Sequence, residues 1–214
     1  MSTRSASLRR LLGYGTGSLS ASARARRMAE FARRFPDIAS WDVVDLGGRP
    51  QFWAESGLRP QSVICVNLEL MHTELAWIHC MQGDACDVAG DLSADLVVSN
   101  SLIEHVGGHA RRELLARTVM DIAPRHWIQT PYRYFPVEPH WMFPGMQFLP
   151  LAVREKVARR HWTQGTHYST DYARRAVAWT ELLSVTELRR LFPDSEIWHE
   201  RVAGLTKSLV AVHA

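Results

Sequence analysis

The sequence predicts an α/β fold in which helices cover a mostly parallel sheet. Short apolar runs alternate along the chain with longer segments of helical periodicity, as expected for repeated strand and helix units. These runs lack a clean alternation of apolar and polar residues, because the strands of such a sheet are buried on both faces. A glycine pair directly after the first run is typical of open α/β sheets that bind a ligand there.

The periodicity assigns strands and helices to defined ranges. The expected strands cover 41–46, 62–67, 95–99 and 126–129, with a closing antiparallel pair at 196–202 and 208–213. The expected helices cover 23–35, 70–79, 109–122, 151–162, 171–183 and 184–192. Ser184 and Glu187 have the spacing of a capping box at the start of the last helix.

Composition limits the class of protein. The 214 residues, 46% hydrophobic and 22% charged, suit a soluble globular domain that needs no disulfide or metal for stability. No apolar run reaches the ~18 residues of a membrane span. Cys65, Cys80 and Cys86 lack zinc-ligand spacing. Their odd number and the lack of a secretory signal favour a cytoplasmic protein.

The amino-terminal segment differs from the rest of the chain. It is rich in Arg and Ser and poor in acids, so we expect residues 1–22 to be a flexible arm before a single domain at 23–214. A transit peptide is the alternative. The net charge of only +3 gives little reason to expect a nucleic-acid partner, although the pI is near 9.0.

Residues 130–150 form a long segment without helical or strand periodicity. It contains several aromatic residues and five prolines, Pro131, Pro136, Pro139, Pro144 and Pro150. Proline fixes φ and interrupts regular helix. Loops of ~20 residues are uncommon in compact domains and usually functional. We therefore expect part of a binding site here.

Polar and glycine-containing motifs follow the predicted strands. They are Asp45-Leu46-Gly47-Gly48, then Asn67-Leu68-Glu69, Gly83-Asp84-Ala85, and the segment from Ser99 through Asn100 and Ser101 to Glu104, His105 and Val106. In this order they resemble the class I S-adenosylmethionine-dependent methyltransferases, above all the small-molecule branch called type 11. Glycan O-methyltransferases of actinobacteria are the members to compare first. The likeness runs from about residue 40 to the end of the chain.

The resemblance implies a Rossmann-like three-layer α/β/α fold, with a seven-stranded, mostly parallel sheet and an antiparallel last strand. It also implies S-adenosylmethionine as cofactor. The methionine part would meet Asp45, Gly47, Gly48, Asn100 and Ser101; the ribose Asn67 and Glu69; the adenine Asp84 and Ala85. Two features depart from the family pattern. The turn lacks the usual G-x-G-x-G, and Asn67 replaces an acidic ribose ligand.

Methyl transfer to oxygen needs a positioned acceptor and removal of its proton. The candidate bases are His105, beside Glu104, and His140, because histidine titrates near neutral pH. A Mg²⁺ ion at Glu104, His105, Glu138 and His140 is an alternative that would acidify the hydroxyl. The expected acceptor-binding residues are Tyr132, Arg133, Tyr134, Glu138, Trp141, His167 and Tyr168. Aromatic rings next to charged groups favour a saccharide or oligosaccharide acceptor.

Other functions fit less well. A nicotinamide dehydrogenase needs G-x-G-x-x-G, which the turn after the first strand does not supply. A nucleic-acid methyltransferase that grips a base amino group carries N-P-P-Y, where this chain has Asn100-Ser101-Leu102-Ile103. A non-catalytic binding or scaffold protein of the same fold stays open because the glycine turn is altered. A homodimer is compatible with the sequence.

Overall fold

The computed structural model describes residues 19–160 and 169–214. Its centre is a seven-stranded sheet in the order β3-β2-β1-β4-β5-β9-β8. The strands are β1 Asp42–Leu46, β2 Ser62–Asn67, β3 Ile78–Gln82, β4 Leu96–Asn100, β5 Arg125–Pro131, β8 Glu196–Val202 and β9 Leu205–His213. The first five are parallel, and β9 runs antiparallel between β5 and β8. This confirms the predicted sheet and its antiparallel closing strand.

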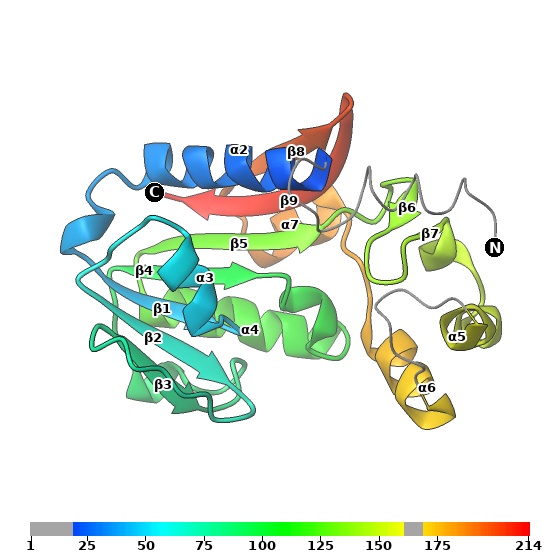
Figure 1. Ribbon diagram of the computed structural model, residues 1–214, viewed down its shortest axis with the longest axis horizontal. Helices are drawn as coiled ribbons and strands as arrows, with labels where there is room; N and C mark the ends of the chain where they lie inside the picture. The colour runs from blue at the N-terminus through cyan, green and yellow to red at the C-terminus, as the bar shows by residue number, and fades with distance from the viewer. Residues whose placement is uncertain (1–18, 161–168) are drawn as a thin grey trace.

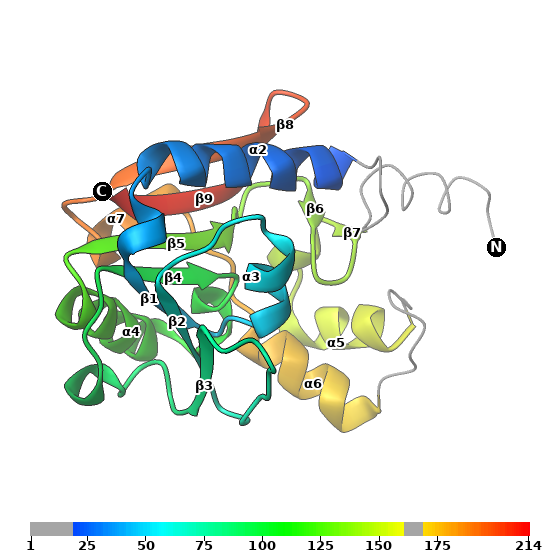
Figure 2. The ribbon, with the colours of Figure 1, turned by 60° about the vertical axis from the view of Figure 1, so that its left-hand side comes forward.

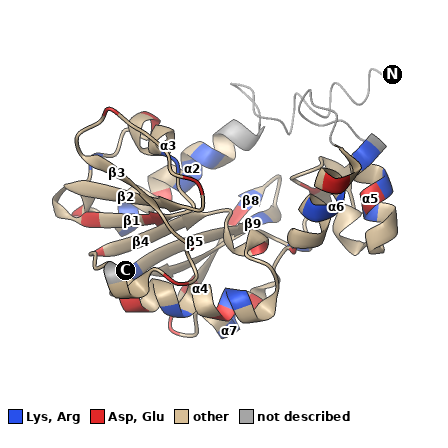
Figure 3. Cartoon of the chain, turned by 90° about the horizontal axis from the view of Figure 1, so that it is seen from below, with Lys and Arg blue, Asp and Glu red and all other residues tan. Residues whose placement is uncertain are grey.

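Two helical layers cover the sheet, as Figure 3 shows from one end. The helices α2 (Leu19–Arg34) and α3 (Pro50–Glu55) lie on one face, and α4 (His109–Ile122) and α7 (Val185–Leu191) lie on the other. Neighbouring strand residues serve opposite cores. Val43 packs with the α2–α3 layer, and Val44 packs with the α4–α7 layer. This two-sided burial explains why the strands are apolar throughout.

The predicted amino-terminal arm is described only in part, and its last residues are helical. Of the predicted arm, residues 1–18 lie outside the described residues, and residues 19–22 already belong to α2. The capping box at α7 is present, with Ser184 and Glu187 bonded reciprocally. Within the described residues, no helix is both long enough and apolar enough to cross a membrane.

The predicted helix at 70–79 is wrong. The chain there is irregular up to β3, which begins at Ile78 and pairs with β2 through Val63. Within this range, Leu70 and Leu75 are 50% and 38% exposed. A short helix in water depends on burying one apolar face. These leucines bury little against the sheet, so a helix would gain no such stabilisation.

A small lobe lies beyond the carboxyl ends of the parallel strands (Figures 1 and 2). It contains the strand pair β6 (Val137–Glu138) and β7 (Phe143–Pro144), then α5 (Leu151–Arg160) and α6 (Thr170–Trp179). The predicted loop at 130–150 therefore holds a short antiparallel pair. Its own small core contains Trp141, Met146, Ala158, Ala173 and Val177.

The helix predicted at 171–183 ends earlier, at Trp179. Residues 180–183 instead run back along the sheet. The carbonyl of Leu183 accepts a hydrogen bond from the backbone N–H of Arg133 (3.0 Å), and Leu183 forms a parallel bridge with Tyr132. These contacts connect the lobe to the extension of β5.

Candidate active site

The turn after β1 requires both of its glycines. Gly47 has φ of +76°, and its N–H donates to the carbonyl of Val66 (2.8 Å). A side chain at Gly48 would place its Cβ 1.8 Å from Oδ2 of Asp45. Since neither position accepts a side chain without displacement, the backbone stays open toward the carboxyl edge of the sheet.

Asp45 lies under this turn and is 1% exposed. Its Oδ2 accepts a hydrogen bond from Nε1 of Trp53 (2.8 Å), and its Oδ1 is buried with no partner among the described residues. Burial raises the pKa of Asp45 to about 7, against the smaller lowering effect of the Trp53 bond. The turn is therefore built over a carboxyl group with one unused oxygen.

The residues after β2 and β3 are partly occupied by contacts within the protein. Nδ2 of Asn67 donates to the carbonyl of Gly48 (2.6 Å), which leaves its Oδ1 as an acceptor. Glu69 is exposed. Both carboxylate oxygens of Asp84 accept from Arg111 (2.7 and 2.6 Å), and Oδ1 also accepts from the N–H of Cys86 (3.0 Å).

These hydrogen bonds favour the ionised form of the Asp84 carboxyl. The Arg111 hydrogen bond is the largest cause that lowers the pKa of Asp84. Ala85, the neighbouring predicted adenine contact, is buried in the core. Asp84 therefore ties the turn after β3 to Arg111 on α4.

The end of β4 turns sharply into the next segment. Asn100 is half-buried at the last strand position, and Ser101 has φ of +55°. The Ser101 hydroxyl donates to Oε1 of Gln129 (3.1 Å), which ties this turn to β5. Leu102 then packs against Gly47, whose Cβ would lie 3.0 Å from it. The turns after β1 and β4 are thus in direct contact.

A buried carboxylate follows this turn, in the short 3-10 helix η3 (Ile103–His105). Glu104 is 1% exposed, and its Oε2 accepts from the hydroxyl of Thr130 on β5 (2.9 Å). Its Oε1 has no hydrogen-bond partner among the described residues. Ser101 is close enough to influence it, but that hydroxyl donates to Gln129. Burial raises the pKa of Glu104.

The structure brings His105 and His140 together, although 34 residues separate them in the chain. Their Nε2 atoms lie 3.0 Å apart. Nδ1 of His140 lies 2.6 Å from Oε1 of Glu138, while Oε2 of Glu138 accepts from the N–H of Trp141 (2.8 Å). Oε1 of Glu104 lies 4.0 Å from Nε2 of each histidine. We call Glu104, His105 and His140 the histidine cluster.

Hydrogen-bond roles in the histidine cluster can be assigned from its neighbours. The hydroxyl of Thr180 donates to the carbonyl of Ala176 (2.7 Å), so Nδ1 of His105, 3.3 Å away, must be the donor to Thr180. The carboxylate of Glu138 likewise requires a donor at Nδ1 of His140. In their neutral forms, both histidines therefore present an unprotonated Nε2 to the cluster.

The two histidines differ in basicity. Burial, followed by the nearby His140, lowers the pKa of His105 to about 4. Burial also lowers the pKa of His140, but the hydrogen bond and charge of Glu138, with Glu104, outweigh it and raise that pKa above its ordinary value. A proton in this pair therefore resides on His140, and His105 stays neutral.

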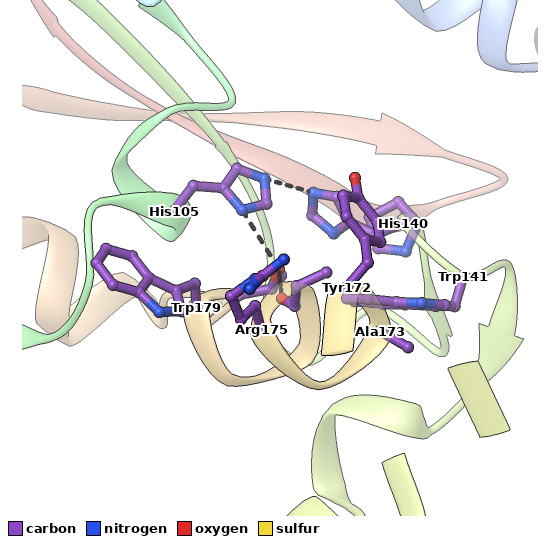
Figure 4. Close-up of a pocket in the computed structure, with 10 residues that line it drawn as sticks. His105, His140, Trp141, Tyr172, Ala173, Arg175 and Trp179 are labelled. Atoms are coloured by element: carbon purple, nitrogen blue, oxygen red, sulfur yellow. Dashed lines mark hydrogen bonds between the residues drawn. The ribbon is translucent and has the colours of Figure 1, made fainter. Parts of the chain in front are cut away.

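A cavity of about 530 Å³ opens beside the histidine cluster (Figure 4). His105 and His140 form one side, and α6 of the lobe forms the other. Trp141 was expected here from the sequence. The contribution of α6 and of Thr180 directly after it was not expected, because these residues lie far along the chain and belong to no motif. In α6 they are Tyr172, Ala173, Arg175, Ala176 and Trp179. The apolar spacing of α6 predicts its buried side, but not the cavity on which it lies.

The other predicted acceptor residues lie elsewhere. Arg133 and Glu138 line a separate, polar cavity of about 210 Å³. Tyr134 is 58% exposed, and its ring lies against Phe148 and Tyr132. The structure thus does not bring these side chains to the cavity at the histidine cluster. His167 and Tyr168 lie outside the described residues.

Comparisons with known proteins bear on the fold. No protein-family model matches the sequence, and no curated protein sequence matches it. Solved structures do match. Magnesium protoporphyrin IX methyltransferase of Synechocystis PCC 6803, crystallised with S-adenosylhomocysteine, has a TM-score of 0.54 at 12% identity over 99% of this chain and 95% of its own. A SAM-dependent methyltransferase of Archaeoglobus fulgidus gives 0.53 at 12% identity over 99% and 100%.

A third neighbour is an O-methyltransferase family protein of Burkholderia thailandensis, with a TM-score of 0.53 at 14% identity. The match covers 92% of this chain and 58% of that one. Together with the sheet order, these likenesses show that the chain has the Rossmann-like methyltransferase fold. At such low identity they show the fold alone.

Proposed function

We propose that this protein is an S-adenosylmethionine-dependent methyltransferase that methylates an oxygen of a small hydroxylated acceptor. One observation carries the proposal. The glycine turn after β1 and the histidine cluster after β4 lie at neighbouring positions on the carboxyl edge of one sheet. In open α/β sheets, this edge is where ligands bind.

The residues at the glycine turn fit the cofactor. Gly47 and Gly48 leave the backbone open at the carboxyl edge of the sheet. The free Oδ1 of Asn67 can accept a ribose hydroxyl. S-adenosylmethionine would supply an activated methyl group. The likeness to a SAM-dependent methyltransferase and to a methyltransferase crystallised with S-adenosylhomocysteine supports this assignment.

The acceptor would occupy the cavity at the histidine cluster. β1, β4 and β5 are adjacent strands spaced by about 4.8 Å, so the cluster and the glycine turn are within reach of one bound pair of substrates. The rings of Trp141 and Trp179 with the guanidinium of Arg175 suit a polyhydroxylated molecule such as a saccharide. His105 lines this cavity with an unprotonated Nε2, which would accept the proton of an acceptor hydroxyl bound there.

The direct test is a transfer assay with methyl-labelled S-adenosylmethionine and separate panels of saccharides, polyols, phenols, carboxylic acids and nucleic acids. We expect label in an ether product of a hydroxylated small molecule, identified by mass spectrometry. Label in a nucleic acid would contradict the proposed substrate class. Cofactor binding without transfer to any panel would support the non-catalytic alternative.

A further inference from the structure

Three side chains with unused electron pairs converge in the histidine cluster. The Nε2 atoms of His105 and His140 lie 3.0 Å apart, and Oε1 of Glu104 lies 4.0 Å from each. Each residue offers one ligand atom to the same small volume. We propose that Glu104, His105 and His140 bind one divalent transition-metal ion of the zinc type. This inference goes beyond the proposed methyl transfer and does not depend on it.

A count of hydrogens supports a cation at this point. With Thr180 and Glu138 each accepting from a histidine Nδ1, the neutral histidines direct two lone pairs at one another. A proton on His140 would connect the two rings. It would still leave Oε1 of Glu104 buried without a hydrogen-bond partner among the described residues, since the nearby Ser101 hydroxyl donates to Gln129. A single metal ion would satisfy all three electron pairs.

Each proposed ligand is held by a second residue. Glu138 orients His140, Thr180 orients His105, and Thr130 holds the other oxygen of Glu104 (2.9 Å). Carboxylate–histidine pairs of this kind fix the ring and raise its basicity at metal centres. The support comes from three separate elements: β5, the β6–β7 segment, and the residue after α6.

The donor set selects the kind of metal. Two imidazole nitrogens and one carboxylate oxygen suit Zn²⁺ and its transition-metal neighbours. Mg²⁺ prefers an all-oxygen octahedron, so it suits this set poorly. The sequence pointed to Mg²⁺ with Glu138 as a fourth ligand. Both oxygens of Glu138 are instead used, on His140 and on the N–H of Trp141, so Glu138 supports a ligand rather than serving as one.

Three protein ligands leave a coordination position open, which is typical of catalytic rather than structural zinc sites. His105 and His140 line the cavity of about 530 Å³, so that position faces the space proposed for the acceptor. A hydroxyl bound there would lose its proton more easily. The ion would then use the lone pair of His105, and acidification by the metal would replace the histidine base.

The test is a titration of the tag-free, chelator-treated full chain with Co²⁺, followed by its visible absorption, and with Zn²⁺ by competition. Elemental analysis gives the metal content. We expect one tightly bound ion per chain, intense visible bands from a low-coordinate Co²⁺, displacement by Zn²⁺, and no displacement by millimolar Mg²⁺. The variants Glu104→Gln and His140→Gln should remove the absorption, and Glu138→Gln should weaken binding about 10- to 100-fold.

The matched control is His126→Gln. His126 is a buried histidine on β5 whose ring is bonded to the hydroxyl of Ser195 (2.7 Å). It lies at the start of β5, whereas Thr130, which contacts the histidine cluster, lies near the end of that strand. It should bind metal like the wild type. No stoichiometric binding by the folded wild type, or equal binding by Glu104→Gln, would overturn the metal site. Either result is independent of S-adenosylmethionine binding, so the proposed function could still stand.

Discussion

The glycine turn and the histidine cluster lie on the same edge of the sheet, but their polar groups are used differently. Around the turn, Asn67 and Asp84 are bonded to Gly48 and Arg111, and Oδ1 of Asp45 is a single buried oxygen without a partner among the described residues. In the histidine cluster, Oε1 of Glu104 and two Nε2 atoms point at one another beside a cavity. Most polar groups around the turn are therefore hydrogen-bonded within the protein. In the histidine cluster, by contrast, three neighbouring polar atoms keep electron pairs that the protein's own hydrogen bonds do not occupy.

The largest effect is expected from His105→Ala. As base or as metal ligand, His105 acts on the acceptor proton, so turnover with an acceptor found in the screen should fall about 100-fold or more. Affinity for S-adenosylmethionine should stay near that of the wild type. The control is His109→Ala, an exposed histidine on α4 paired with Glu113. Wild-type turnover in His105→Ala would remove the functional difference between the two regions.

The second prediction concerns Asp45 under the glycine turn. Its pKa is about 7 in the folded protein and near 3.8 when unfolded, so the folded state retains the proton between these values. This contribution to stability is fully present below pH 3.8 and is lost as pH rises through 7. It amounts to about 4 kcal/mol at most. The free energy of unfolding of wild type minus Asp45→Asn should therefore fall across this window. A flat difference curve would contradict the buried, protonated carboxyl.

A third prediction addresses the close packing at the turn. Gly48→Ala would place a methyl group 1.8 Å from Oδ2 of Asp45, which is fixed by Trp53. We expect a loss of about 1–3 kcal/mol in the free energy of unfolding, and weaker cofactor binding. Gly90→Ala is the control, since a Cβ there meets nothing within 4 Å. Denaturant unfolding of both variants measures the difference, and equal stability would show that the turn can relax.

The smallest effect is expected from Arg111→Gln. The pair with Asp84 is more than one-third exposed on both sides, and such ion pairs contribute about 1 kcal/mol or less. The variant would also release the carboxylate of Asp84 from its partner. If Asp84 binds the adenine, calorimetry should show a change in affinity for S-adenosylmethionine larger than the change in stability. An unchanged affinity would limit Asp84 to its structural role.

The sequence predicted one of these regions better than the other, for a physical reason. The strand ends at Gly47, Asn67 and Asn100 follow from local patterns, because each motif sits within a few residues of its strand. The proximity of His105 and His140 was predicted only from the fact that both residues lie in segments that follow strand ends. Arg175 on α6 and Thr180 directly after it contribute to the cavity and to the histidine cluster. Their position depends on how the lobe packs on the sheet, which no local sequence pattern encodes.

The same distinction explains the failures. The segment at 70–79 was expected to be a helix, but Leu70 and Leu75 are exposed, so a helix there would bury no apolar face. The aromatic residues at 132–134 were expected in the binding site because they share its loop. Tyr132 and Tyr134 instead pack on one another, Tyr134 also packs on Phe148 at the surface, and Tyr132 packs against the core. Nearness in the chain was a poor guide where a segment reverses direction, as it does around β6 and β7.

The proposed cofactor is tested most directly by calorimetric titration of the purified full chain with S-adenosylmethionine and with S-adenosylhomocysteine. We expect both to bind at one site in the micromolar range, with affinity weakened in Gly48→Ala and retained in His105→Ala. If the folded protein bound neither ligand, the proposal that it is an S-adenosylmethionine-dependent methyltransferase would be contradicted, and the fold would serve another function.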